Sequence, residues 1–403
     1  MKSKESVRWS FLAAGIISML FAGVLYAWSI LKAPLSEELG WSSSQLALNF
    51  TVTMWTFCIG GFLGSIIAKR LGSKLVISAG AILAGLGFAL SSTLSGARII
   101  PLYLYYGIFS GFGIGIAYIV TISAVSAWFP DKKGLCSGCL MMGFGASTML
   151  LGNIMSSMMA SLGWRRAYLI LGIAIAAVIA GAGLFIRFPS EGDALPAPAV
   201  KKAAAKEAFD ATDMPTSQMI RRFTFWRAFL CIVFLAAVGN TVISFARDLA
   251  LSVGASVSLA TTLVGVLALC NGLGRILTGA LFDLAGRRVT MLCACIVTII
   301  AAGITLAAVA VSSLPLCIVG LCIVGLSYGS CPTLNSAFTS AFYGLKYFST
   351  NFSIMTFNLM GASALATAGN SLLVSFGTYS APLIMLISLA AAALLLNLTI
   401  KRP

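Results

Sequence analysis

One apolar segment, VLALCNGLGRILTGALFD, carries a single charged side chain before its final aspartate. This side chain is Arg275, and Asn271 stands four residues before it. Residues at positions i and i+4 share one face of a helix, so both side chains can point into the same cavity. A guanidinium matches a carboxylate with two parallel hydrogen bonds. We therefore expect Arg275 and Asn271 to bind a small carboxylate anion. The alternative is a structural arginine paired with a neighbouring helix.

Arg247 and Asp248 lie next to each other near the end of another apolar segment. Adjacent residues on a helix do not face each other, so each is expected to have a different partner. Asp248 is the candidate for proton coupling or for a gate. Arg247 either belongs to the same gate or anchors the helix at the outer surface.

Two tyrosines, Tyr118 and Tyr328, follow the glycine-rich stretches GFGIGIAY and GLSY. A phenol offers a hydrogen-bond donor and an apolar face, so both could close the cavity or donate to the carboxylate; packing is the alternative. Four further residues are expected to line the cavity unless they face lipid or other helices: Leu25, Asn335, Phe357 and Met360.

The composition excludes a soluble protein. Of 403 residues, 59% are hydrophobic and 9% are charged, against about 25% charged in an average soluble protein. The sequence has no histidine and only eleven acidic residues. Imidazole metal sites and histidine bases are therefore impossible, and we expect neither an enzyme nor a metal or cofactor site. Ten cysteines lie in or beside apolar stretches, as small buried hydrophobes do.

Twelve apolar runs are long enough to span a bilayer, which takes about 20 residues per helix. The first six runs are 9–31, 44–68, 75–95, 99–128, 134–162 and 166–187. The second six are 224–251, 256–282, 289–312, 314–342, 348–375 and 378–400. We expect an all-α membrane protein with an N-terminal bundle (1–187), a polar cytoplasmic linker (188–222) and a C-terminal bundle (223–403).

The basic residues indicate the orientation. With a cytoplasmic N-terminus, twenty Lys and Arg residues fall on the inside and four on the outside. This bias predicts that both termini are cytoplasmic and that the chain is a multi-pass protein of the plasma membrane, with a prokaryotic inner membrane expected. It also accounts for the net charge of +15 without a nucleic-acid partner.

Two matches at nearly the same offset indicate an internal repeat. The segment SIIAKRLGSK begins at Ser65, and GALFDLAGRR begins 214 residues later at Gly279. Tyr118 and Tyr328 are 210 residues apart. The pattern G-x-x-x-D-x-x-G-R-R resembles the loop signature of the major facilitator superfamily, although Lys69 stands where the first copy should have aspartate. This resemblance implies two six-helix bundles that bind substrate near the membrane midplane.

Three segments narrow the resemblance. WFPDKKGLCSGCLMMGFG, from Trp128, is similar to a loop region shared by the oxalate/formate antiporter and monocarboxylate transporter families. YAWSILKAPLSEELGWS, from Tyr26, and FYGLKYFSTNFSIM, from Phe342, resemble the oxalate/formate group. The resemblance covers nearly the whole chain and implies transport of small carboxylates, with Arg275 at the place of an arginine essential in both families.

The sequence departs from these families at two places. Monocarboxylate transporters show D-x-x-x-R where this chain has Asn271 and Arg275, so a proton carrier is missing there. Oxalate exchangers place a lysine in helix 11, near Leu359 or Met360 of this chain, whose span from 348 to 375 is uncharged. One buried cation suits one carboxylate, because a second buried charge without a partner is costly.

We therefore expect a proton-coupled symporter of monocarboxylates such as lactate or pyruvate, working by alternating access in the lipid bilayer. The proton would travel on Asp248 or on the substrate carboxylate. An exchanger of the oxalate/formate type is the alternative among transporters. A non-transporting sensor or scaffold is the alternative of another class.

Overall fold

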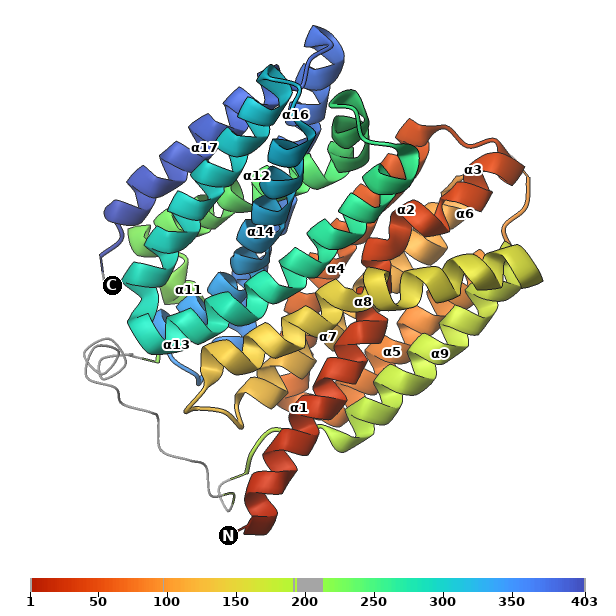
Figure 1. The fold of residues 1–403 in the computed structure, drawn as a ribbon. Helices are drawn as coiled ribbons and strands as arrows, with labels where there is room; N and C mark the ends of the chain where they lie inside the picture. Colours follow the sequence, from red (N-terminus) through yellow and green to blue (C-terminus); the bar gives the residue numbers. More distant parts are fainter. Residues whose placement is uncertain (1, 97, 191–192, 194–212, 402–403) are drawn as a thin grey trace. The chain divides into compact units, whose positions relative to one another are not determined.

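In a computed structural model, the described residues are 2–96, 98–190, 193 and 213–401, and they form helices and no strand (Figure 1). The first half contains α1 (Lys2–Ala22), η1 (Gly23–Ala27), α2 (Trp28–Leu31), α3 (Ala33–Leu39), α4 (Ser43–Leu71), α5 (Ser73–Ser91), α6 (Ile100–Leu102), η2 (Tyr103–Ser110), α7 (Gly111–Ser126), α8 (Lys133–Leu162) and α9 (Trp164–Phe185). The second half contains α11 (Thr216–Met219), α12 (Phe223–Ser252), α13 (Val257–Ala310), α14 (Leu314–Tyr343), α15 (Phe348–Thr356), α16 (Asn358–Phe376) and α17 (Ser380–Leu398).

The membrane spans agree with the hydropathy prediction. Eleven helical segments of the described chain are long and apolar enough to cross a membrane. The longest, α13, has 54 residues and contains two spans that meet at Gly286. The predicted twelve-span all-α membrane fold is therefore confirmed, with spans eight and nine joined directly rather than by a loop.

The chain divides into two compact units. Unit 1 comprises Met1–Asp131 and Gly143–Pro198, and unit 2 comprises Lys132–Met142 and Ala199–Pro403. The first turns of α8 thus group with unit 2, although the sequence places them in the first bundle. Most of the expected linker 188–222 lies outside the described residues.

Glycines permit the close helix packing of unit 1. A Cβ on Gly115 would lie 2.0 Å from the carbonyl oxygen of Phe57 in α4, and one on Gly113 would lie 2.5 Å from that of Gly80 in α5. Both glycines lie in α7, two residues apart, so Gly115 faces α4 and Gly113 faces α5. The glycine-rich stretch is therefore a packing motif of the kind found between membrane helices.

The WFPD motif fixes one end of unit 1. Asp131 accepts a 2.8 Å hydrogen bond from Arg8 of α1, and both side chains are largely buried. The Trp128 indole N–H donates to the carbonyl of Arg187 at 2.7 Å. The motif therefore ties the loop before α8 to the first and sixth spans.

The repeat is also visible in the backbone. Gly72, between α4 and α5, has φ 79° and ψ 161°, and Gly286, 214 residues later, has φ 76° and ψ 179°. This backbone region is open only to glycine. Equivalent positions of the two sequence copies thus make the same turn.

Candidate substrate-binding site

Arg275 is the central residue of the candidate site and is 1% exposed. Its Nε donates to Oδ1 of Asn271 at 3.2 Å, and its Nη1 donates to the backbone carbonyl of Met141 in α8. All three residues belong to unit 2. Both acceptors are neutral, and in the described part of the chain no carboxylate forms an ion pair with this guanidinium. The site therefore holds a buried cation in place without neutralising its charge.

Glycines of α14 bring that helix against the backbone around Arg275. A Cβ on Gly329 would lie 2.2 Å from the Asn271 carbonyl oxygen and 3.0 Å from the Arg275 nitrogen. Gly274 approaches the carbonyl of Leu326 in the same way. Thr333, one turn further along α14, donates to the Arg275 carbonyl at 3.2 Å. The arginine is thus presented by two helices in backbone contact.

The first turns of α8 also contact α13 close to Arg275. A Cβ on Gly138 would lie 2.6 Å from the Arg275 carbonyl oxygen, and one on Gly279 would lie 2.2 Å from that of Gly134. Asp283 accepts hydrogen bonds from the backbone N–H groups of Gly134 at 3.0 Å and Leu135 at 2.9 Å. A carboxylate is favourable at a helix N-terminus. The aspartate of the G-x-x-x-D pattern therefore caps the helix that supplies the Met141 carbonyl.

Asn335 forms a hydrogen-bonded pair with Asn358 at the start of α16. Each amide donates to the other's oxygen, at 3.3 Å from Asn335 and 2.5 Å from Asn358, and both residues are buried. These two hydrogen bonds satisfy one N–H donor and the oxygen acceptor of each side-chain amide. Asn335 therefore joins α14 to α16, and its predicted contact with a substrate stays a prediction.

Helix interruptions mark the predicted lining residues Leu25 and Phe357. Leu25 lies in the 3-10 turn η1 and is fully buried. Phe357 lies between α15 and α16, where its own N–H bonds to Ile354 and its carbonyl accepts from Met360, both in the tighter i to i+3 pattern. Phe357 and Met360 are half-buried.

The two tyrosines pack within different units. Tyr118 of α7 packs against Phe57 and Phe144 of unit 1, with ring centroids 5.1 and 4.9 Å apart. Tyr328 of α14 packs against Gly239 of α12, where an added Cβ would meet the ring at 2.3 Å. Packing therefore accounts for both rings, and their contact with a ligand stays a prediction.

Arg247 and Asp248 are exposed and lie close to the end of α12 at Ser252. Burial first, and then the negative charge of Asp248, raise the pKa of Tyr379, which precedes α17. The ring of Phe245, three residues before Asp248, lies 5.3 Å from the ring of Tyr379, so this end of α12 lies beside the start of α17. The predicted gate or proton-coupling role of this pair stays a prediction.

Sequence reasoning missed three partners of the site. Asn358 was detectable, because a buried amide within an apolar span needs a hydrogen-bond partner. Thr333 had a weaker signal, since threonines commonly bond to their own helix. Met141 acts through its carbonyl, which no side-chain pattern reports. In the described residues, no group of three or more His, Cys, Asp or Glu side chains could hold a metal ion.

Long membrane spans, a repeated glycine turn and a buried cation with neutral partners are the features of a polytopic membrane protein with an internal repeat. The family model of the Major Facilitator Superfamily matches residues 11–367. The chain therefore belongs to this superfamily, and its transporter fold is confirmed.

Curated relatives agree with this membership. The uncharacterized MFS-type transporter YhjX of Escherichia coli (strain K12) is 26% identical over 355 residues, covering 87% of this chain and 84% of the relative. The oxalate:formate antiporter of Oxalobacter formigenes is 27% identical over 292 residues, covering 70% of this chain and 65% of the relative. Monocarboxylate transporter 11 of Homo sapiens is 29% identical over 160 residues, covering 40% and 34%.

Solved structures support the fold alone. The proton:xylose symporter XylE has a TM-score of 0.75 at 13% identity, with 99% of this chain and 97% of that chain covered. The transporter FucP in its outward conformation has a TM-score of 0.71 at 13% identity, with 97% and 99% covered.

Proposed function

We propose that this transporter carries small monocarboxylates, such as lactate or pyruvate, in symport with a proton. The observation that carries the proposal is Arg275, which is 1% exposed and hydrogen-bonded only to neutral acceptors among the described residues. A buried charge without a counter-ion is costly, so an anionic ligand is its natural complement. The guanidinium is fixed by its Nε and Nη1 contacts, which leaves its remaining N–H groups to bind a carboxylate.

The number of cations favours one carboxylate over two. The eleventh span, α15 and α16 from Phe348 to Phe376, contains no charged residue. A dicarboxylate bound at Arg275 would keep one charge unpaired in a site of low dielectric. The Oxalobacter formigenes relative is an oxalate:formate antiporter, and we propose that this chain differs by preferring singly charged acids.

Voltage favours coupling to a proton. A short carboxylic acid has a pKa of about 3.5–4 and is an anion at neutral pH. Moving that anion into a negative interior costs about 2.3 kcal/mol per 100 mV, and one accompanying proton removes this cost. Because Asp248 is exposed near the end of α12, we place the proton on the substrate carboxylate beside Arg275. We also propose that both termini face the cytoplasm. The two halves would move so that the site opens alternately to each side of the membrane.

Uptake into liposomes tests the proposal. Purified protein is reconstituted, and labelled lactate and oxalate are compared with and without an inward proton gradient. We expect gradient-driven lactate accumulation, little oxalate uptake, and no uptake by an Arg275→Ala variant. Arg166→Ala, which removes an exposed arginine, is the matched control.

The same assay separates the alternatives. An exchanger of the oxalate/formate type would need substrate inside the vesicles before any label entered. A sensor or scaffold would bind lactate without flux. Net lactate uptake into empty vesicles contradicts both alternatives, and its absence contradicts the symport proposal.

A further inference from the structure

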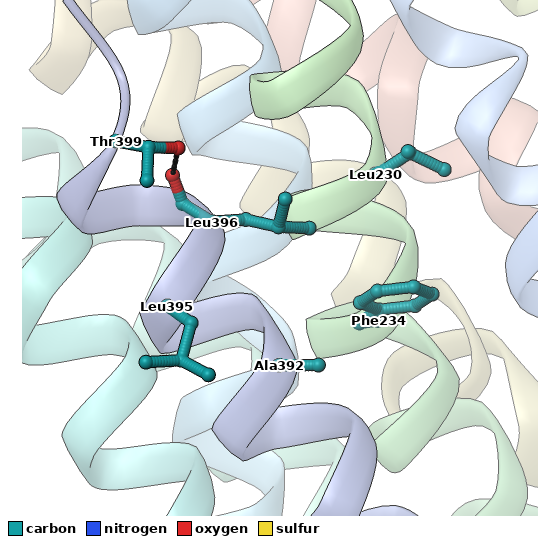
Figure 2. A pocket seen from close by; sticks show the side chains of 6 residues that line it. All are labelled: Leu230, Phe234, Ala392, Leu395, Leu396 and Thr399. Carbon is teal, nitrogen blue, oxygen red and sulfur yellow. Dashed lines mark hydrogen bonds between the residues drawn. The ribbon is translucent and has the colours of Figure 1, made fainter.

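An apolar groove lies between α12 and α17 in unit 2 (Figure 2). Its volume is about 460 Å³. Its lining consists of Leu230, Phe234, Ala392, Leu395, Leu396 and Thr399. The Thr399 hydroxyl donates to the Leu396 carbonyl at 2.7 Å, so it is satisfied within its own helix. The groove therefore offers hydrocarbon to a ligand.

The groove opens to the outside of the bundle. Leu230 is 40% exposed and Leu395 is 66% exposed, and both lie on membrane-spanning helices. In a bilayer, such a surface meets acyl chains rather than water. The groove is thus shaped for a flexible apolar chain entering from the membrane.

A cation stands at one end of this groove. Arg227 precedes Leu230 by three residues and so shares its helix face. The Arg227 Nη1 donates to the Thr399 carbonyl at 2.8 Å, which holds the guanidinium beside a lining residue. Lys401 is exposed two residues after Thr399, and its carbonyl accepts a 2.9 Å hydrogen bond from Thr224 of α12. The guanidinium of Arg227 and the backbone of Lys401 are therefore held where the groove ends.

The surrounding chemistry is that of a membrane interface. Trp226, beside Arg227, is 47% exposed, and its indole N–H donates to the Ile220 carbonyl at 2.8 Å. Tryptophans with one polar contact are typical of the headgroup level. No acidic residue occurs in α17, and the one in α12 is Asp248, near the far end of that helix. The charge at this end of the groove is therefore positive.

We propose that this groove is a binding site for an anionic phospholipid. One acyl chain lies along Leu230, Phe234 and Leu395, and the phosphate is bound by Arg227 and Lys401. A cation near an anionic lipid surface contributes about fivefold in affinity. The lipid would join α12 to α17 on the surface of unit 2. The site is separate from Arg275 and does not depend on which substrate is carried.

Lipid titration monitored by native mass spectrometry tests the proposal. The full-length protein is delipidated in a neutral detergent and titrated with phosphatidylglycerol or phosphatidylcholine. We expect one phosphatidylglycerol molecule to bind several-fold more tightly than phosphatidylcholine. Arg227→Gln combined with Lys401→Gln should weaken phosphatidylglycerol binding about tenfold or more and leave phosphatidylcholine nearly unchanged.

Two further variants separate the headgroup from the chain. Ala392→Phe fills the groove and should weaken binding of both lipids, while the cations remain. Arg70→Gln removes an exposed basic residue at the end of α4 in unit 1 and should change nothing. Unchanged phosphatidylglycerol binding in the double variant, in protein with a wild-type helical content, overturns the proposal. An equal loss in Arg70→Gln does so too, because it shows nonspecific attraction. If the double variant does not fold, an Ala392→Phe protein with wild-type lipid binding overturns the proposal by itself.

Discussion

Asn271 accepts a 3.2 Å hydrogen bond from Nε of Arg275 across one turn of α13. An aspartate at this position would neutralise the arginine within the protein. The amide orients the guanidinium and leaves its charge for a ligand. With aspartate at this position the empty site would be neutral, and with Asn271 the empty site is cationic.

We expect Arg275 to supply the main contact to the substrate. Arg275→Lys keeps the charge but loses the planar fork, and should weaken lactate or pyruvate binding about tenfold or more, since a charge-assisted hydrogen bond contributes roughly 1.5–3 kcal/mol. Arg275→Ala should abolish binding. Calorimetric titration of the purified variants measures both effects. Wild-type affinity in a folded Arg275→Ala protein would contradict the assignment and leave Arg247 as the next candidate.

We expect a second cation to shift the preference toward dicarboxylates. Leu359→Lys and Met360→Lys each introduce a charge at a half-buried position at the start of α16. Oxalate would then have two cations for its two charges. Competition by oxalate against labelled lactate uptake measures the shift. If both variants fold and transport lactate but neither gains oxalate uptake, the argument from the number of cations fails.

Asp248→Asn tests where the proton travels. The sequence favours Asp248 as the acid within a span, whereas its exposure near the end of α12 favours the substrate. With the proton on the substrate, we expect the variant to keep most of its pH-driven lactate accumulation. A selective loss of accumulation, with lactate exchange intact, would return the proton to Asp248.

Gly329→Ala should destabilise the protein around the candidate site. The new Cβ would lie 2.2 Å from the Asn271 carbonyl oxygen, so backbone must shift. Such overpacking costs about 1–3 kcal/mol. Gly303→Ala is the matched control, since a Cβ there meets nothing within 4 Å. Thermal unfolding in detergent should show a lower midpoint for Gly329→Ala alone; equal midpoints would mean that the α13–α14 contact is not tight.

We expect an effect of pH at Glu38, which lies in the first half of the chain. Glu38 accepts hydrogen bonds from the Trp164 indole at 2.5 Å and from Arg165 at 2.6 Å, and these bonds lower the Glu38 pKa below 4.5. Because the Glu38 pKa is lower in the folded state than in the unfolded state, the ionised carboxylate stabilises the folded state at pH values above the unfolded-state pKa. This stabilisation is lost as the pH falls through the folded-state pKa. Fluorescence of Trp164 should therefore change below pH 4.5. Glu38→Gln should remove this transition, and Glu37→Gln, at an exposed neighbour, should keep it.

The sequence predicted the spans well because each is a long apolar run, and it predicted Arg275 because a charge in such a run is rare. Local departures from regular helix were not predictable. The 3-10 turn at Gly23–Ala27 and the π-helix at Tyr103–Ser110 have no sequence signature of their own. The Met141 carbonyl was hidden for a different reason: every residue has one, and only tertiary packing selects which carbonyl meets a guanidinium.

The turn at Gly286 limits which parts of the chain can move independently of each other. Two membrane-spanning segments meet there at one residue whose φ of 76° and ψ of 179° exclude a side chain. With no intervening loop to absorb strain, the segment bearing Arg275 and the one that follows it are expected to rotate together as a single stiff hairpin. Gly72 imposes the same restriction on α4 and α5. Flexibility during a transport cycle must then come from elsewhere, such as the interrupted helices at Leu25 and Phe357, so crosslinks placed within either hairpin should leave turnover intact.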